Sequence, residues 1–192
     1  MATTASLRTS LSGILSTDSL APDAELERYA VEGLVPKAAA FPTSQEQVAA
    51  VLGLAGEERL TVVPRGSGSL MALGSVPERL DIVLGMDRLF SPIEHAPGDM
   101  TVTVGAGSTL ESLQETLEKE GQWLPLDPPL APQRTVGGIL ATGLTGPLSL
   151  AYGTTRDMVL GMKVAGTDGI ITKSGGKVVK NVTGFDVTKA HL

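Results

Sequence analysis

The chain has 192 residues, a formal net charge of −6 and no cysteine. Its length suits one medium domain or two small ones, and a hydrophobic content of 42% with 19% charged residues is ordinary for a globular fold. The acidic balance and an aromatic content of 3% argue against a nucleic-acid-binding surface, while the lack of cysteine excludes disulfides, thiolate nucleophiles and zinc–thiolate sites.

Residues 1–28 begin with the Ser- and Thr-rich stretch MATTASLRTSLSGILS, which lacks the long apolar core of a secretory signal. We expect this segment to be poorly ordered. No apolar run approaches the length of a membrane span, so the default expectation is a cytoplasmic protein. His95 and His191 lie far apart without the spacing of metal ligands, and no metal site is expected.

Strands alternate with helices in the middle of the chain. In FPTSQEQVAAVLGLAGEERL, Thr43 and Glu46 have the spacing of a capping box at a helix start. The stretches LTVVP, LDIVLGM and TVTVGAG predict strands. STLESLQETLEKEG predicts a second helix, with Ser108 and Glu111 as its capping box, Gly121 as its end, and one apolar face formed by Leu110, Leu113 and Leu117.

The amino-acid composition changes after residue 121. Residues 122–147 are rich in proline and glycine around one short apolar run, so regular secondary structure is expected to occupy little of them. The stretch VLGMKVAGTDGIITKSGG then predicts two strands joined by a tight turn at Asp168 and Gly169. The final stretch GFDVTKAHL begins like a helix.

Two glycine-rich loops compete as phosphate sites. Gly105 and Gly107 lie between a strand and a helix, as in a nicotinamide-binding Rossmann motif, but the third glycine position holds Leu110, and a plain helix start is favoured. The loop RGSGSLMALG, which begins at Arg65, follows the strand LTVVP and fits neither a Rossmann nor a Walker motif.

The loop after Arg65 suggests a phosphate cradle that is not attached to a helix. Arg65 would supply charge, and the hydroxyls of Ser67 and Ser69 with the amides of residues 66–69 would supply donors. A second segment, RTVGGILATGLTGP, would let its backbone pack against a planar or phosphate-bearing ligand at Gly137 and Gly138. Two such segments suggest one long ligand. Turn and ligand contact stay equally open for Gly143, Gly146 and Gly153.

The order of six segments carries a resemblance to a known family. They are YAVEGLVPKAAAFPTSQEQV, VVPRGSGS, TVTVGAGSTLESLQETLEKEGQWLPLDPP, TVGGILATGLTGP, YGTTRDMVLGMKVAGTDG and GGKVVKNVTGFDVTK. The chain resembles the FAD-binding domain of the vanillyl-alcohol-oxidase and para-cresol-methylhydroxylase (PCMH) type. Within that family the KNVTGFDVTK stretch is similar to the glycolate oxidase FAD-binding subunit and its 2-hydroxy-acid dehydrogenase relatives.

The resemblance implies an α+β fold, in which residues 29–192 form a PCMH-type domain of two α/β subdomains with FAD between them. Family members continue past the position of Leu192 into a C-terminal substrate-binding cap domain, so the chain is expected to be truncated and to lack that domain. Residues 65–74 contain no histidine, and non-covalent FAD is expected.

The resemblance also implies which residues contact the cofactor. Those of the pyrophosphate loop are Arg65, Gly66, Ser67, Gly68 and Ser69. Those on the flavin side are Asp127, Pro128, Thr135, Gly137, Gly138, Ala141, Thr142 and Gly143. Ile171, beside the expected turn at Asp168, would lie near the adenine.

The function implied is that of an FAD-binding subunit of a 2-hydroxy-acid oxidase or dehydrogenase complex, with glycolate as the expected substrate. Hydride would pass from substrate to flavin, and electrons would pass on to a partner subunit. Any membrane association would be made through partner subunits, and no catalytic base is identified. The alternative is a non-catalytic module that holds flavin or serves as a structural part of a larger complex.

Overall fold

The computed structural model describes residues 3–89, 91–176 and 188. The chain divides into two compact units, one of residues 1–89 with 165–171 and the other of residues 90–164 with 172–192. Both contain helices and strands, which confirms the α+β class and the two subdomains expected from the sequence. The predicted helix start in GFDVTKAHL falls outside the described residues apart from Thr188.

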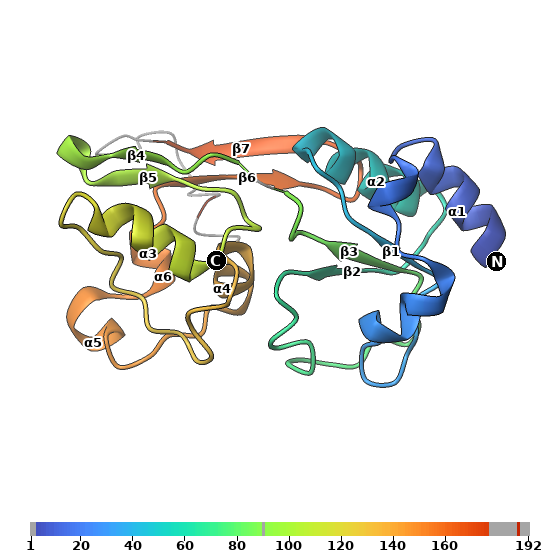
Figure 1. The fold of residues 1–192 in the computed structure, drawn as a ribbon, viewed down its shortest axis with the longest axis horizontal. Coiled ribbons are helices and arrows are strands. Elements are labelled where there is room, and N and C mark those ends of the chain that lie inside the picture. Colours follow the sequence, from blue (N-terminus) through green and yellow to red (C-terminus); the bar gives the residue numbers. More distant parts are fainter. Residues whose placement is uncertain (1–2, 90, 177–187, 189–192) are drawn as a thin grey trace. The chain divides into compact units, whose positions relative to one another are not determined.

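A three-stranded parallel sheet forms the centre of the first unit (Figure 1). Strand β3 (Ile82–Gly85) lies between β1 (Ala38–Ala40) and β2 (Val62–Arg65), and pairs with both in parallel. A central strand has neighbours on both edges, and every residue of β3 is buried. The predicted strands LTVVP and LDIVLGM are therefore confirmed. LDIVLGM forms the middle strand of the sheet and LTVVP one of its edges.

The start of the chain is folded onto this sheet, and the expectation of a poorly ordered segment is wrong for residues 3–28. Helix α1 (Thr4–Ser12) is followed by the 3-10 helices Thr17–Ser19 and Asp23–Tyr29. Leu7 and Leu11 are fully buried in the same cluster as the strands. Apolar residues four positions apart share a helix face, so this spacing gave a signal that the Ser- and Thr-rich composition hid.

Helix α2 (Gln45–Glu57) begins one residue later than the predicted capping box. The hydroxyl of Ser44, rather than Thr43, accepts a hydrogen bond from the amide of Gln47 at 3.2 Å. The side-chain oxygen of Gln47 accepts one from the amide of Thr43 at 2.8 Å. Thr43 and Ser44 both suit a cap, so composition alone does not decide between them.

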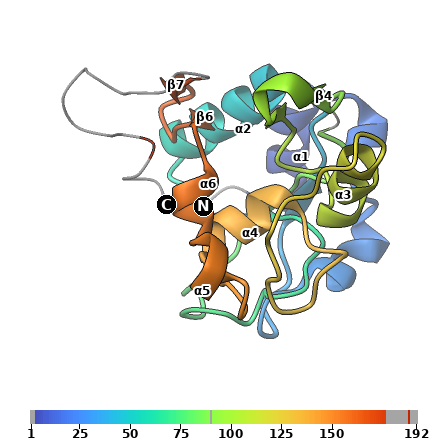
Figure 2. The ribbon, with the colours of Figure 1, turned by 90° about the vertical axis from the view of Figure 1, so that its left-hand side faces the viewer.

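The second unit holds the strands β4 (Glu94–Ala96) and β5 (Thr101–Thr103), which pair antiparallel. His95 lies in β4, and its Nε2 is 2.9 Å from Oε1 of Gln122. Along the chain there follow α3 (Leu110–Glu118), α4 (Val136–Thr142), α5 (Ser149–Tyr152) and α6 (Thr155–Met158) (Figure 2).

Helix α3 confirms the predicted apolar face, because Leu110, Leu113 and Leu117 are all buried. Its cap is Thr109, whose hydroxyl accepts from the amide of Ser112 at 3.2 Å, so the predicted cap at Ser108 is displaced by one residue. Like α2, this helix starts where two cap-forming residues stand side by side.

Strands β6 (Gly161–Ala165) and β7 (Ile171–Gly175) pair as a two-stranded sheet and confirm the predicted hairpin. The carboxylate of Asp168 accepts a hydrogen bond from the amide of Ile170 at 3.0 Å, and Gly169 has φ +75°. The turn therefore uses the two residues that the sequence indicated. Among the described residues, no helix is long and apolar enough to cross a membrane.

Candidate functional site

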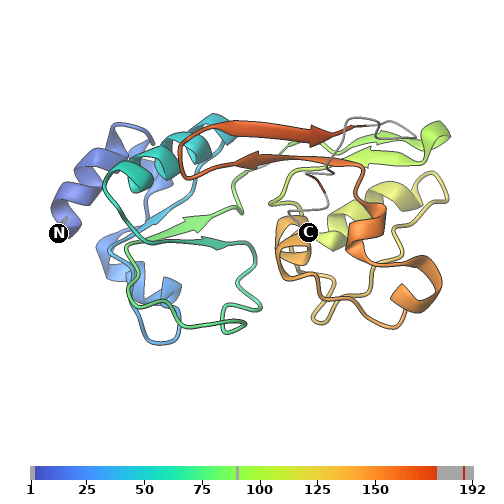
Figure 3. The same ribbon diagram turned by 180° about the vertical axis from the view of Figure 1, so that it is seen from behind.

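The glycine-rich loop leaves the sheet of the first unit at the end of β2 (Figure 3). Arg65 is the last residue of that strand and pairs with Gly85 of β3, and its carbonyl accepts a hydrogen bond from the amide of Met86 at 2.8 Å. In open sheets of parallel strands, ligands bind beyond the carboxyl ends of the strands. The loop of residues 66–75 begins at such an end.

The first residues of this loop carry a set of unused donors. Within the described part of the chain, the backbone amides of residues 66–69 donate no hydrogen bond. The hydroxyl of Ser67 donates to that of Ser69 at 3.2 Å, and Arg65 forms no ion pair with a described carboxylate. Free amides, hydroxyls and an unneutralised guanidinium are the chemistry that binds a phosphate group, so the residues present fit the pyrophosphate of FAD.

Gly68 leaves room for the Arg65 side chain. Its backbone has φ +75°, and a Cβ atom added there would lie 2.6 Å from a terminal nitrogen of the Arg65 guanidinium. The guanidinium carbon also lies 5.4 Å from the centre of the Tyr29 ring. The glycine is therefore required by the neighbouring cation as well as by the turn.

The predicted flavin-side residues of the second unit gather at α4. The hydroxyl of Thr135 caps this helix by accepting from the amide of Gly138 at 3.3 Å. Gly137 donates to the carbonyl of Ala106 at 2.9 Å, and a Cβ atom at Gly137 would lie 2.9 Å from the Ala106 side chain. The short helix was not expected from the sequence, because glycine and threonine are weak helix formers and its contacts are with distant residues.

Three further glycines have structural explanations in the same unit. Gly143 ends α4 with φ +60°, and Gly153 has φ +87° beside Asp157. Gly146 lies directly against the backbone carbonyl of Asp127. These three glycines therefore have structural roles in turns and close packing, and their contact with a cofactor stays a prediction.

Asp127 has a hydrogen-bonding role that sequence reasoning did not identify. Its carboxylate accepts from the amide of Leu148 at 3.1 Å and so holds the turn of residues 146–148. Pro128, the next predicted residue, is buried. Ala141 and Thr142 lie in the last turn of α4, and Ile171 opens β7 beside the turn of the first unit. Contact of these residues with a cofactor stays a prediction.

Arg134 is a charged residue at this site that sequence reasoning missed. It is only 2% exposed, and one guanidinium nitrogen donates to the carbonyl of Gly138 at 2.9 Å and to the hydroxyl of Thr142 at 2.6 Å. The other terminal nitrogen is buried without a hydrogen-bond partner among the described residues. Burial lowers the pKa of Arg134. A single arginine before a glycine-rich stretch gives no signal of burial in a sequence.

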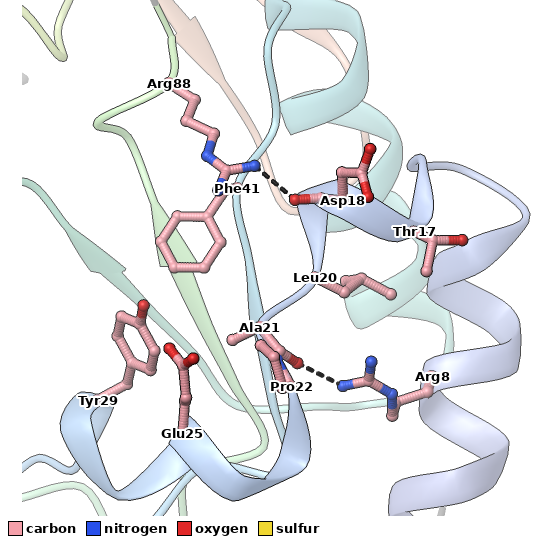
Figure 4. Close-up of a pocket in the computed structure, with 10 residues that line it drawn as sticks. All are labelled: Arg8, Thr17, Asp18, Leu20, Ala21, Pro22, Glu25, Tyr29, Phe41 and Arg88. Carbon is pink, nitrogen blue, oxygen red and sulfur yellow. Dashed lines mark hydrogen bonds between the residues drawn. The ribbon is translucent and has the colours of Figure 1, made fainter.

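The first unit also contains a cavity of about 500 Å³ on the side of the N-terminal segment (Figure 4). Its lining includes Arg8, Arg88, Tyr29 and Phe41, and none of the predicted site residues borders it. Arg8 donates a hydrogen bond to the carbonyl of Ala21 at 2.6 Å, and Arg88 donates one to the carbonyl of Asp18 at 2.5 Å. The residues that line this cavity are therefore not those of the predicted cofactor site.

Comparison with known proteins agrees with the loop chemistry. A family model described as FAD binding domain matches residues 36–175. The chain is 32% identical over 158 residues to glycolate oxidase subunit GlcD of Bacillus subtilis, covering 82% of this chain and 34% of that protein. It is 35% identical over 146 residues to D-lactate dehydrogenase of Archaeoglobus fulgidus, covering 76% and 32%.

A solved structure of alkyldihydroxyacetonephosphate synthase has the same fold. It superposes with a TM-score of 0.78 at 24% identity, over 97% of this chain and 37% of that one. The chain spans about a third of the length of the curated relatives it matches. With the family match over residues 36–175, the resemblance seen in the sequence is confirmed, and the chain belongs to the PCMH-type family of FAD binding domains, whose cofactor is FAD.

Proposed function

We propose that the chain is the FAD-binding part of an oxidoreductase that oxidises the CH–OH group of a 2-hydroxy acid, with glycolate as the substrate. The relatives named as a glycolate oxidase subunit and a D-lactate dehydrogenase support this class, because glycolate and lactate are both 2-hydroxy acids. Their shared chemistry is the removal of two electrons from the carbon next to a carboxylate.

The observation that carries the proposal is the row of unused donors after Arg65. In this proposal, that arginine and the amides of residues 66–69 hold the pyrophosphate of FAD. In the same proposal, residues of α4 with Asp127 and Pro128 contact the flavin side of the cofactor. When bound, FAD accepts the hydride of the substrate, and the protein supplies position and electrostatics.

Electron transfer to a partner subunit belongs to the same proposal, as does a cytoplasmic location. The word subunit in the name of the Bacillus relative supports an assembly of several chains. Electrons leaving the reduced cofactor need an acceptor, and a partner chain that copurifies with this one is the proposed acceptor.

Anaerobic flavin reduction tests the proposal. The protein is purified with its copurifying subunits, saturated with FAD, and mixed with glycolate or D-lactate while the absorbance of oxidised flavin is followed. We expect glycolate to bleach the flavin, with D-lactate reporting the breadth of the substrate class. Bound flavin that no 2-hydroxy acid reduces would support the alternative, a module that holds flavin without catalysing this oxidation. Failure to bind FAD would contradict both functions.

A further inference from the structure

Three residues stand in a row across the carboxyl ends of the strands in the first unit. Arg65 of β2 is paired with Gly85 of β3, and Phe41 directly follows β1, whose last residue pairs with Leu84. Directly paired residues of neighbouring strands project to the same face of a sheet. Gly85 has no side chain, and the Phe41 ring occupies the space that its Cβ would fill.

Tyr29 joins this row from a distant part of the sequence. It is the last residue of the 3-10 helix Asp23–Tyr29, and its ring meets that of Phe41 in an edge-to-face arrangement, with centroids 5.3 Å apart and planes at 61° (Figure 4). Phe41 is itself buried, so the Tyr29 ring rests on a fixed support.

The Tyr29 ring holds a cation without neutralising it. The guanidinium carbon of Arg65 lies 5.4 Å from the ring centre, within the range of a cation–π interaction. No described carboxylate pairs with Arg65. A carboxylate in that place would orient the arginine equally well but would cancel its charge, whereas an aromatic face leaves the charge available to an anion.

We propose that Tyr29 is a positioning residue of the cofactor site, which fixes the Arg65 guanidinium for the pyrophosphate of FAD. Gly68 leaves space for that guanidinium, because a Cβ atom there would lie 2.6 Å from one of its nitrogens. The N-terminal segment thus contributes to anion recognition by the loop, although Tyr29 touches no phosphate itself. This inference rests on the proposed role of Arg65 in FAD binding.

The test measures the affinity of the apoprotein for FAD by titration of flavin fluorescence. Tyr29→Leu and Tyr29→Met remove the aromatic face and are expected to weaken FAD binding about three- to tenfold, the range of one lost cation–aromatic contact. Tyr29→Phe keeps that face and should stay within about twofold of wild type. Arg88→Gln is the matched control, because Arg88 lies over the Phe41 ring at 5.2 Å and donates to the carbonyl of Asp18 rather than to a residue of the loop. It should leave the FAD affinity unchanged.

A double-mutant cycle separates this inference from the proposed function. In an Arg65→Gln background, Tyr29→Leu should cause no further loss of FAD affinity, since the ring acts only through that cation. Wild-type affinity of both Tyr29→Leu and Tyr29→Met, with weak binding by Arg65→Gln, would overturn the role of Tyr29 alone. Wild-type affinity of Arg65→Gln would overturn the proposed site itself.

A variant of Arg65 keeps the inference testable if the Tyr29 variants do not fold. Arg65→Lys preserves the charge but loses the planar group that stacks on the ring. We expect its FAD affinity to fall toward that of Arg65→Gln. An affinity equal to wild type would show that charge alone matters and would overturn the role of Tyr29.

Discussion

Asp81 and Lys37 form an ion pair of 2.8 Å in which the carboxylate is 2% exposed and the ammonium is a third exposed. The Asp81 carboxylate also accepts a hydrogen bond from the amide of Thr61 at 2.8 Å, and it lies 3.4 Å from the guanidinium of Arg79. Asp81 directly precedes β3, so these bonds tie the central strand to the chain that enters both neighbouring strands.

This pair makes stability depend on pH. Burial by itself raises the pKa of Asp81, but the hydrogen bonds from Lys37 and Thr61 and the nearby positive charges outweigh it and lower the pKa. A depressed pKa means that the stabilisation is present above the unfolded value of about 3.9 and is lost as the pH falls through the folded value. Asp81→Ala should lower the free energy of unfolding by about 2–3 kcal/mol at neutral pH.

Urea unfolding across a pH series measures this effect. The difference between wild type and Asp81→Ala should shrink as the pH falls below about 4. Asp23→Ala is the matched control, because Asp23 pairs with Arg8 at 2.9 Å but is largely exposed, and its loss should cost less than about 1 kcal/mol. A pH-independent difference for Asp81→Ala would contradict the electrostatic explanation.

Gly68→Val should weaken FAD binding by more than about tenfold, because the new side chain would displace the Arg65 guanidinium and strain a backbone with φ +75°. Gly74→Val separates these two causes. Gly74 has φ +102° in the same loop, but a Cβ atom there would meet no atom within 4 Å. Equal losses of FAD affinity in the two variants would attribute the effect to backbone strain alone.

The two glycines inside α2 should respond in opposite ways to alanine. At Gly53 an added Cβ would make an ordinary contact of 3.4 Å with Gly169, so Gly53→Ala should raise the free energy of unfolding by about 0.5–1 kcal/mol through helix propensity. At Gly56 an added Cβ would collide with the carbonyl of Thr167. Gly56→Ala should therefore lower the free energy of unfolding by about 1–3 kcal/mol. Chemical denaturation of both variants checks the sign, and stabilisation by Gly56→Ala would rule out the close contact.

FAD should be released completely by acid precipitation. The chain has no cysteine, and residues 65–74 contain no histidine that could attach flavin at the loop. After precipitation, the flavin absorbance should be found in the supernatant, with a covalent flavoprotein treated in parallel as the control for retention. Flavin left in the washed precipitate would disprove non-covalent binding.

The sequence predicted those features that local patterns encode. Leu110, Leu113 and Leu117 repeat with the period of a helix, and Asp168 with Gly169 forms the turn that its chemistry favours. The caps of α2 and α3 were each misplaced by one residue, because two suitable residues adjoin at each start.

Long-range contacts could not be predicted in this way. The Tyr29 ring reaches Arg65 only once the N-terminal segment has packed on the sheet, and no spacing rule links positions so far apart. The same holds for Arg134, whose burial follows from the helix that folds over it. The loop donors at residues 66–69 could be predicted because they follow each other in the chain. Tyr29, which lies against Arg65, could not be predicted because it is distant in sequence.

The turn at residues 165–171 packs against α2, although about a hundred residues of chain separate them. During synthesis, Gly53 and Gly56 therefore leave the ribosome long before Thr167 and Gly169 do. The N-terminal unit cannot reach its final packing until most of the second unit has been translated, and contacts this distant in sequence form slowly. A nascent chain that stalls before the hairpin would expose the face of α2 that the turn covers in the folded protein. Chaperones bind exposed surface of this kind, so rapid translation of the hairpin would shorten the exposure.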